Sequence, residues 1–217
     1  MPSQTRLDGC SRRYAHQIER LGEFLAVAQP SILTATSSRV PAEVLLDAVV
    51  VLTVSYLDAY LNCLVGLGTA HQEPVVREYL KRYGSPQERN LADSCNLGQL
   101  MHFARTRISF ANKGRKLEQI FDLLFGFSPW PDNNAGSLIR DLVRVRNIIV
   151  HAGGWPNAAH ANDAETTGLI VESHKISYRL SVAPFIREML TAAGMLSVYV
   201  QEKLAVHPKF GLRQVRR

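Results

Sequence analysis

Apolar residues recur every three or four positions along most of the chain, which is the spacing of helices that bury one face. Residues 11–29 predict a first such helix. Its apolar stripe comprises Tyr14, Ile18, Leu21, Leu25 and Ala28. Further long helices are predicted over 41–65, 134–151 and 182–205, so the pattern indicates an all-α protein built on a bundle of these four helices.

Prolines and glycines divide the rest of the chain. Pro41 suits the first turn of the second long helix, and Gly66 and Gly68 are expected to end it. The stretch 69–133 is predicted to be a helical insertion packed on one end of the bundle. Within it, we expect a helix over Glu73–Tyr83 that ends at Gly84, then short helices and loops, then a helix from Lys113 to Phe127.

The C-terminal part departs once from helical spacing. Residues 168–172 and 175–180 are rich in β-branched side chains and predict two short strands of a hairpin. We expect one domain over residues 41–205. The N-terminal helix and link of residues 1–40 would join it, and residues 206–217 would form a basic tail.

Composition restricts the class of protein. The chain has 217 residues, of which 46% are hydrophobic and 20% charged, so it is long enough for a core and is not a disordered polyelectrolyte. The apolar stretch Val44–Leu67 contains Asp47 and Asp58, which favours a core helix over a membrane span. With no apolar leader segment at the N-terminus, the expected location is the cytoplasm and no membrane association is expected.

Cysteine usage points to the same compartment. Cys10, Cys63 and Cys95 are too few and too scattered for a disulfide framework, and no C-x-x-C pair suggests structural zinc. We therefore expect reduced thiols. The net charge of +6 and the sequence pI of about 9.4 favour an anionic partner such as nucleic acid.

One polar cluster stands out, at the end of the helix predicted over 134–151. It includes Arg140, Arg144, Arg146, Asn147 and His151, and two glycines follow it. Histidine transfers protons near neutral pH, and the planar guanidinium of arginine binds phosphate oxygens in a fork. These are the groups needed for RNA cleavage by its own 2′-hydroxyl, which requires a base, an acid and positive charge at the phosphate.

The run Arg146-Asn147-Ile-Ile-Val-His151 resembles the R-N-x-x-x-H form of the motif of HEPN domains. The long helix from Leu46 to Leu61 is similar to the helix that precedes the motif in that family. The segment Lys116–Phe125, together with the strand-like 170–180 and the last helix, resembles the bacterial branch associated with RiboL-PSP proteins. The resemblance spans about residues 41–205 and implies an all-α HEPN-like four-helix bundle.

The resemblance also implies an activity. HEPN proteins are often metal-independent ribonucleases that form homodimers and belong to toxin–antitoxin or antiphage defence systems. By this resemblance the chain would cleave RNA without a cofactor, with an antitoxin or defence protein as a partner. His151 would be the general acid and base, Arg146 would stabilise the charged phosphorane, and Asn147 would position the phosphate or His151.

Helix geometry leaves one choice open. At about 100° per residue, Arg144 and Asn147 share a face with His151, whereas Arg146 lies about 140° from His151. Arg146 would then lie toward the apolar side, where Asp47 or Asp58 could pair with it. We assign catalysis to Arg146, Asn147 and His151 and an auxiliary phosphate contact to Arg144.

Other residues carry weaker hypotheses. Further phosphate contacts are assigned to Arg140 and to the basic run Lys113, Arg115 and Lys116, which is otherwise an ordinary solvated loop. A metal site at His151, His160, Asp163 and Glu165 is disfavoured by the irregular spacing of these residues. Two alternatives to a ribonuclease remain: a non-catalytic module that binds nucleic acid or protein, and a structural dimer in which the motif is incidental.

Overall fold

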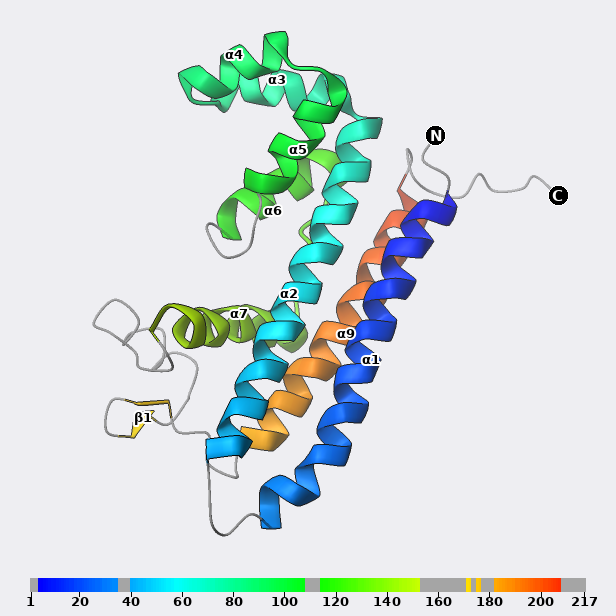
Figure 1. Ribbon diagram of the computed structural model, residues 1–217. Helices are drawn as coiled ribbons and strands as arrows, with labels where there is room; N and C mark the ends of the chain where they lie inside the picture. Colours follow the sequence, from blue (N-terminus) through cyan, green and yellow to red (C-terminus); the bar gives the residue numbers. More distant parts are fainter. Residues whose placement is uncertain are drawn as a thin grey trace, which may run out of the picture. The chain divides into compact units, whose positions relative to one another are not determined.

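The computed structural model describes residues 4–34, 40–107, 114–152, 171–172, 175–176 and 182–207. Within these ranges the protein is all-α apart from one small hairpin (Figure 1), which confirms the predicted fold class. The helices are α1 (Gln4–Thr34), α2 (Val40–His71), α3 (Glu73–Tyr83), α4 (Pro86–Ser94), α5 (Leu97–Arg107), α6 (Gly114–Phe125), α7 (Asn134–Ala152) and α9 (Val182–Val206).

The predicted hairpin is present in a shorter form. β1 (Val171–Glu172) pairs antiparallel with β2 (Lys175–Ile176), with Val171 opposite Ile176. The four long helices predicted from the apolar spacing correspond to α1, α2, α7 and α9, and all four are longer than expected, α7 and α9 by one residue each.

The chain forms two compact units, each of which contains part of α1, α2 and α9. Unit 1 comprises Met1–Arg13, Asp58–Pro129 and Val198–Arg217, and unit 2 comprises Tyr14–Leu57 and Trp130–Ser197. Each unit therefore combines chain segments that are far apart in sequence.

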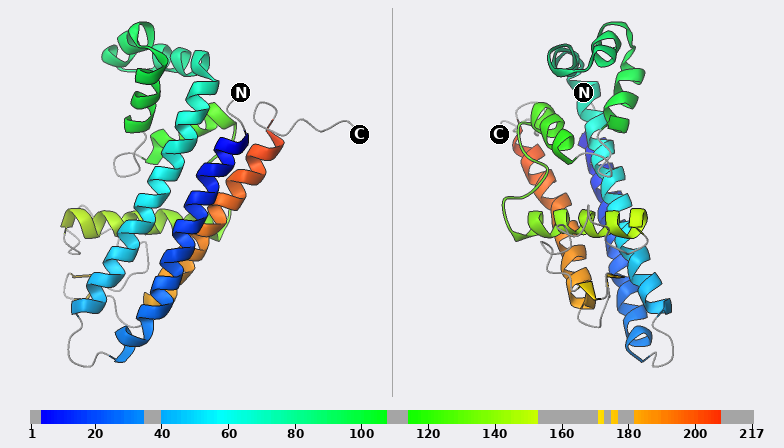
Figure 2. Two further views of the ribbon diagram at one scale, coloured as in Figure 1. Left: turned by 45° about the vertical axis from the view of Figure 1, so that its right-hand side comes forward. Right: turned by 90° about the vertical axis from the view of Figure 1, so that its left-hand side faces the viewer.

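In unit 2, the segments of α1, α2 and α9 lie side by side, and α7 runs crosswise to them (Figures 1 and 2). The Tyr14 hydroxyl donates a hydrogen bond of 2.9 Å to the carbonyl oxygen of Ala193, which joins α1 to α9. The apolar stripe predicted for the first helix is buried at Tyr14, Ile18, Leu21 and Leu25. Burial of this stripe is the main force that holds α1 in place.

In unit 1, α3 to α6 are joined to the remaining segments of the long helices. Helices α3 and α4 lie side by side in both views of Figure 2. An aromatic cluster of Phe121, Phe125, Phe127 and Tyr199 has ring centroids 4.5–6.2 Å apart, and it packs α6 and the following turn against α9. The Tyr199 hydroxyl also donates to the carbonyl oxygen of Ser128 at 3.3 Å.

The prediction that Gly66 and Gly68 end the second long helix is wrong, because α2 continues to His71. Both glycines are needed for close packing instead. A Cβ at Gly68 would lie 2.7 Å from Cζ of Phe125, and one at Gly66 would meet the Arg105 guanidinium. The absence of a side chain lets α6 and Arg105 approach the helix backbone.

Helix α3 ends as predicted, whereas α6 ends at Phe125, two residues before the predicted Phe127. Helix α3 ends at Tyr83, and the amide of Gly84 donates to the Leu80 carbonyl oxygen at 2.8 Å. Helix α4 begins with a capping box, in which the Ser85 amide donates to Glu88 Oε2 at 2.6 Å and the Glu88 amide donates to Ser85 Oγ at 3.4 Å. The short helices predicted within 85–112 are α4 and α5.

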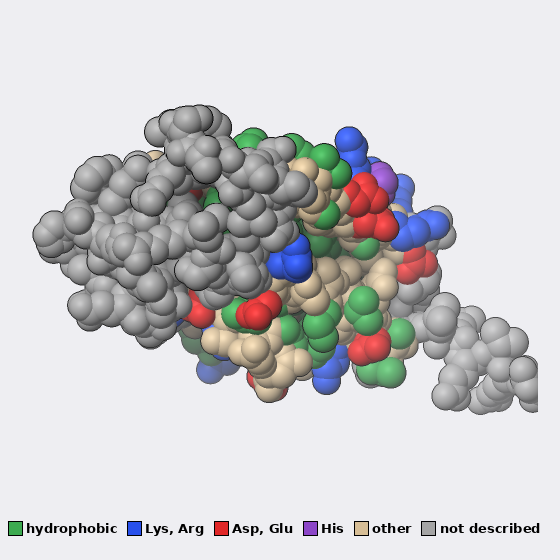
Figure 3. All heavy atoms as spheres, turned by 90° about the horizontal axis from the view of Figure 1, so that it is seen from below, with side chains coloured by type: hydrophobic (Ala, Val, Ile, Leu, Met, Phe, Trp, Pro, Cys, Tyr) green, Lys and Arg blue, Asp and Glu red, His purple; other side chains and the backbone are tan. Residues whose placement is uncertain are grey.

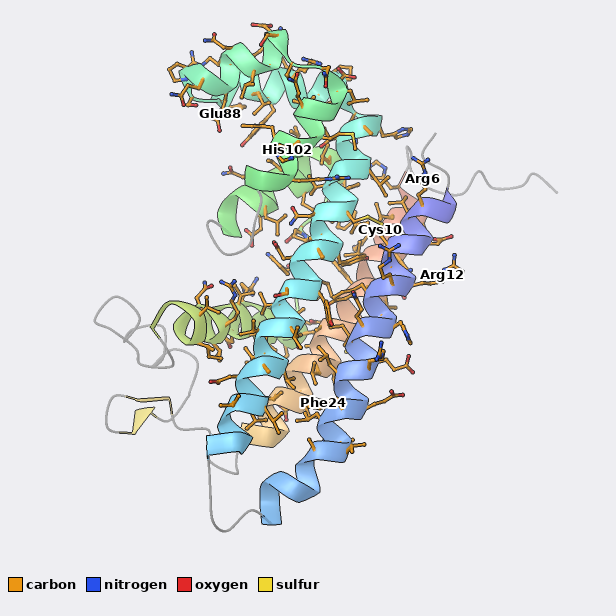
Figure 4. The ribbon with its side chains drawn as sticks, in the orientation of Figure 1. Arg6, Cys10, Arg12, Phe24, Glu88 and His102 are labelled. Atoms are coloured by element: carbon orange, nitrogen blue, oxygen red, sulfur yellow. A yellow bond between two sulfur atoms is a disulfide. The ribbon has the colours of Figure 1, made fainter. Side chains whose placement is uncertain are left out.

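The expectation of reduced thiols is wrong for one pair of cysteines. Cys10 on α1 and Cys63 on α2 form a disulfide, with their Cα atoms 6.6 Å apart (Figure 4). One turn away, Ser11 Oγ and the Tyr60 hydroxyl lie 3.1 Å apart, so the same pairing of helices brings both contacts together. Cys95 is a buried free thiol. The spacing of 53 residues gave no sign of this contact, because it depends on how α1 packs against α2.

Helix α2 is also long and apolar enough, over Val44–His71, to cross a membrane by length and composition, a criterion that core helices also meet. Leu57, Leu61 and Leu64 on this helix are almost fully buried. Such burial is what the predicted core helix requires.

Several large apolar side chains remain exposed. Figure 3 shows hydrophobic side chains interspersed with charged ones on one face of the molecule. The exposed apolar residues of unit 2 include Phe24, Val27, Val44, Leu52, Val150 and Met195.

Candidate functional site

Helix α7 carries the motif, and its start is fixed by local contacts. Asn133 Oδ1 accepts a hydrogen bond of 2.9 Å from the amide of Ala135, which caps the first turn. A Cβ at Gly136 would overlap the carbonyl oxygen of Pro131, so the glycine lets the preceding segment cross close to the helix. Ile139, Leu142 and Val145 are buried along one side, which fixes the rotation of α7 about its axis.

Arg146 lies toward the buried side, as ideal helix geometry predicted. Its side chain is half-buried, and Nη1 donates a hydrogen bond of 3.0 Å to Oδ1 of Asn147. Its Nε is buried and has no hydrogen-bond partner among the described residues. The guanidinium therefore has one donor, Nε, that no described group satisfies.

The hydrogen bond from Arg146 also determines which groups of Asn147 remain for a ligand. Because the amide oxygen of Asn147 accepts from Arg146, the amide nitrogen carries the remaining donors of that side chain. The two adjacent residues of the motif are thus coupled to each other.

Arg144 has a different partner. Its Nη1 lies 3.1 Å from Oδ1 of Asp141, one turn earlier on the same helix. Asp141 is the more buried of the two, with 18% of its side chain exposed against 39% for Arg144. Burial raises the pKa of Asp141, and the charge of Arg144 opposes that rise. A phosphate bound by Arg144 would compete with this carboxylate.

The remaining motif residues are placed only in part. The backbone of α7 extends through His151 to Ala152, while the side chain of His151 lies outside the described part of the structure. Positions 147 and 151 are four residues apart, so they share a helical face. Arg140 is exposed on the same helix as Arg144 and Arg146.

The basic run assigned to phosphate belongs to the other compact unit. Lys113 is outside the described residues. Arg115 and Lys116 lie in the first turn of α6, in unit 1, and the structure describes their backbone alone. All of the described α7 residues belong to unit 2. His160, Asp163 and Glu165 fall in a range that the structure does not describe.

The two aspartates that could pair with Arg146 are half-buried on α2. Asp47 belongs to unit 2, as Arg146 does, and Asp58 belongs to unit 1. Trp130, in the turn before α7, is buried, with 3% of its surface exposed.

Sequence reasoning missed Asp141 and a pocket in unit 1. The spacing of Asp141 and Arg144, three positions apart on a predicted helix, was the signal available for the ion pair. The pocket has a volume of about 500 Å³, and its polar lining includes Tyr79, Glu88 and Asp122. Its residues come from four helices, so no local sequence pattern marks it.

Comparison with known proteins adds no relative. No family model matches the chain, and neither a curated protein nor a solved structure matches it. The resemblance to HEPN domains therefore depends on the residues of α7 and on the helical pattern around them.

Proposed function

We propose that the protein is a metal-independent endoribonuclease with its catalytic residues on α7. The observation that carries the proposal is the arrangement of Arg146, whose guanidinium is held by Asn147 and keeps a buried donor without a partner among the described residues. A phosphate oxygen is the acceptor that suits such a fork. The net charge of +6 supports attraction of RNA.

In the proposed mechanism, His151 removes the proton from the 2′-hydroxyl and later protonates the leaving 5′-oxygen. The 2′-oxygen attacks the adjacent phosphorus, the bond to the 5′-oxygen breaks, and a 2′,3′-cyclic phosphate remains. Arg146 stabilises the charge that develops on the phosphorane, and Asn147 donates from its amide nitrogen to a phosphate oxygen. Arg144 and Arg140 contact flanking phosphates.

His151 is the single motif histidine of each chain, and it can act as either the base or the acid at a given moment. We therefore propose that two copies of the chain form a composite site. A two-fold axis beside α7 would place two motifs opposite each other. Val150, next to His151, is 46% exposed, and burial of such apolar side chains would stabilise a dimer. Under this proposal, activity per chain falls on dilution through the range where the dimer dissociates, and a monomer with full activity contradicts the composite site.

Purified protein and a labelled RNA test the residue roles. His151→Ala is expected to abolish cleavage with native helix content, because the proton carrier is lost. Arg146→Lys is also expected to be inactive, since an ammonium cannot replace the fork. Arg144→Ala should weaken RNA binding more than turnover. If Arg144→Ala is inactive while Arg146→Ala cleaves normally, the assignment to Arg146 is wrong.

A second candidate function is a non-catalytic module that binds nucleic acid. It is favoured by the exposed Arg140 on α7 and by the net charge of +6, since both suit phosphate contacts that need no proton carrier. A shift of labelled RNA on a gel with no cleavage would support this function.

A further inference from the structure

The pocket in unit 1 has an unusual combination of aromatic rings and carboxylates. Its volume of about 500 Å³ is within the range of sites for small molecules. Tyr79 and Tyr83 of α3 line one side, with ring centroids 5.3 Å apart and planes inclined by 44°. Phe103 of α5 adds a third ring. We refer to this site as the aromatic pocket.

Two carboxylates share the aromatic pocket with these rings. Glu88 of α4, labelled in Figure 4, is buried with 8% of its surface exposed, whereas Asp122 of α6 is exposed. The capping box holds the Glu88 carboxylate in place, since Oε2 accepts from the Ser85 amide at 2.6 Å. The position of this negative charge is therefore set before any ligand binds.

The charge of Glu88 acts on Tyr79, one of the rings that line the aromatic pocket. Burial raises the pKa of Tyr79, and the neighbouring charge of Glu88 raises it further. The faces of aromatic rings also carry partial negative charge, which attracts cations. The ring of Tyr83 already binds one cation in this way, because the guanidinium carbon of Arg82 lies 5.3 Å from its centroid.

Basic side chains around the aromatic pocket are held by other groups. Lys81 Nζ lies 2.7 Å from Oδ1 of Asp93, and Arg89 Nε donates to the Gly84 carbonyl oxygen at 2.9 Å. Arg77 is bound by Glu73 and by the carbonyl oxygens of Ala92 and Cys95. Arg77, Lys81 and Arg89 do not line the aromatic pocket, while Arg89 contacts it through Gly84 and Arg82 contacts it through Tyr83.

We infer that the aromatic pocket binds a small organic cation, a guanidinium or alkylammonium group on a short apolar chain. Glu88 and Asp122 pair with the charge, the rings of Tyr79, Tyr83 and Phe103 surround it, and the apolar chain contacts the buried floor. The floor is formed by Leu80 and Ile120, which are 5% and 9% exposed. This inference is independent of the ribonuclease proposal, because it concerns other residues in the other unit.

Calorimetric titration of the full chain tests the charge preference directly. Butylguanidinium is expected to bind, and butylurea, its neutral isostere, should bind at least about tenfold more weakly. Binding of butylguanidinium should weaken as salt is raised. Equal binding of the two compounds, or no binding of butylguanidinium, would overturn the inference.

Variants locate the site. Asp122→Asn and Tyr83→Leu should each weaken butylguanidinium binding about tenfold, whereas Tyr83→Phe keeps the ring and should bind normally. Asp93→Asn is the matched control, since it removes a carboxylate on α4 that pairs with Lys81 outside the pocket. Equal effects of Asp122→Asn and Asp93→Asn would show that only the general charge of the protein matters, and would refute the site.

The source of the cation is distinguished by a further titration. A free metabolite is indicated if butylguanidinium binds as tightly as a capped Gly-Arg-Gly peptide. A protein side chain is indicated if the peptide binds about tenfold more tightly, because the flanking backbone then adds contacts. Both results support the cation site, and failure of both ligands refutes it.

Discussion

Substituting single glycines by alanine gives opposite effects on stability at two helical positions. In a helix interior, alanine is favoured over glycine by roughly 0.5–1 kcal/mol, because glycine loses more backbone entropy on folding. A Cβ at Gly22 of α1 has no atom within 4 Å, so Gly22→Ala should raise the free energy of unfolding by up to about 1 kcal/mol.

Gly68→Ala gains the same helix propensity, but overpacking in the core costs more free energy than this gain. The new Cβ would lie 2.7 Å from Cζ of Phe125 and 3.1 Å from Cδ1 of Leu124. Both side chains are about 1% exposed and cannot move into solvent. Overpacking of this kind costs about 1–3 kcal/mol, so we expect a net loss of about 1 kcal/mol.

Urea unfolding followed by far-UV circular dichroism measures both variants, and they should differ by about 2 kcal/mol. Gly66→Ala provides a further comparison: the atoms nearest to its Cβ belong to the guanidinium of Arg105, the far end of a flexible side chain, so its effect should lie between the other two. If Gly68→Ala is stabilised as much as Gly22→Ala, the packing of α6 against α2 is not as described.

Three further predictions concern titration, redox state and RNA binding. Burial raises the pKa of Tyr60 from 10.0 to about 12, so the unfolded chain releases this proton first, and stability should fall between these pH values. Tyr60→Phe should lessen that fall, and an unchanged pH profile would contradict the burial. Alkylation of the unfolded, unreduced protein should label Cys95 alone, whereas labelling of all three cysteines would contradict the disulfide. Asp141→Asn should strengthen RNA binding several-fold at low salt, because it removes the carboxylate that competes for Arg144, and weaker binding in a filter assay would contradict that competition.

The elements of the fold were predictable where signals are local. The apolar stripe of α1, the end of α3 at Gly84 and the break before α7 follow from side-chain spacing and from the backbone preferences of proline and glycine. The end of α2 was mispredicted, because Gly66 and Gly68 have the same sequence signature whether they end a helix or accommodate a neighbour. Only the packing of Phe125 and Arg105 distinguishes the two.

The candidate site, too, was predictable only where the signal in the sequence is local. The direction of Arg146 toward the buried side followed from the helical angle alone. Its bond to Asn147 was not predicted, because adjacent residues on a helix do not normally face each other. The aromatic pocket joins four helices through long-range packing, and the Cys10–Cys63 pair joins two, so neither leaves a pattern in the sequence.

The Cys10–Cys63 disulfide is relevant to the cellular compartment of the protein. A disulfide persists in an oxidising compartment and is uncommon in the cytoplasm. Protection of Cys10 and Cys63 from alkylation would therefore favour an oxidising compartment, and labelling of both would favour the cytoplasm.

We propose that His151 and Arg146 of α7 cleave RNA without a metal ion. The most direct measurement is the end chemistry of a labelled RNA after incubation with the protein in EDTA, beside His151→Ala. The wild-type chain should give fragments that end in 2′,3′-cyclic phosphate, and the RNA should stay intact with His151→Ala. Intact RNA in both samples, or cleavage that requires a divalent ion and leaves 5′-phosphate ends, would contradict this proposal.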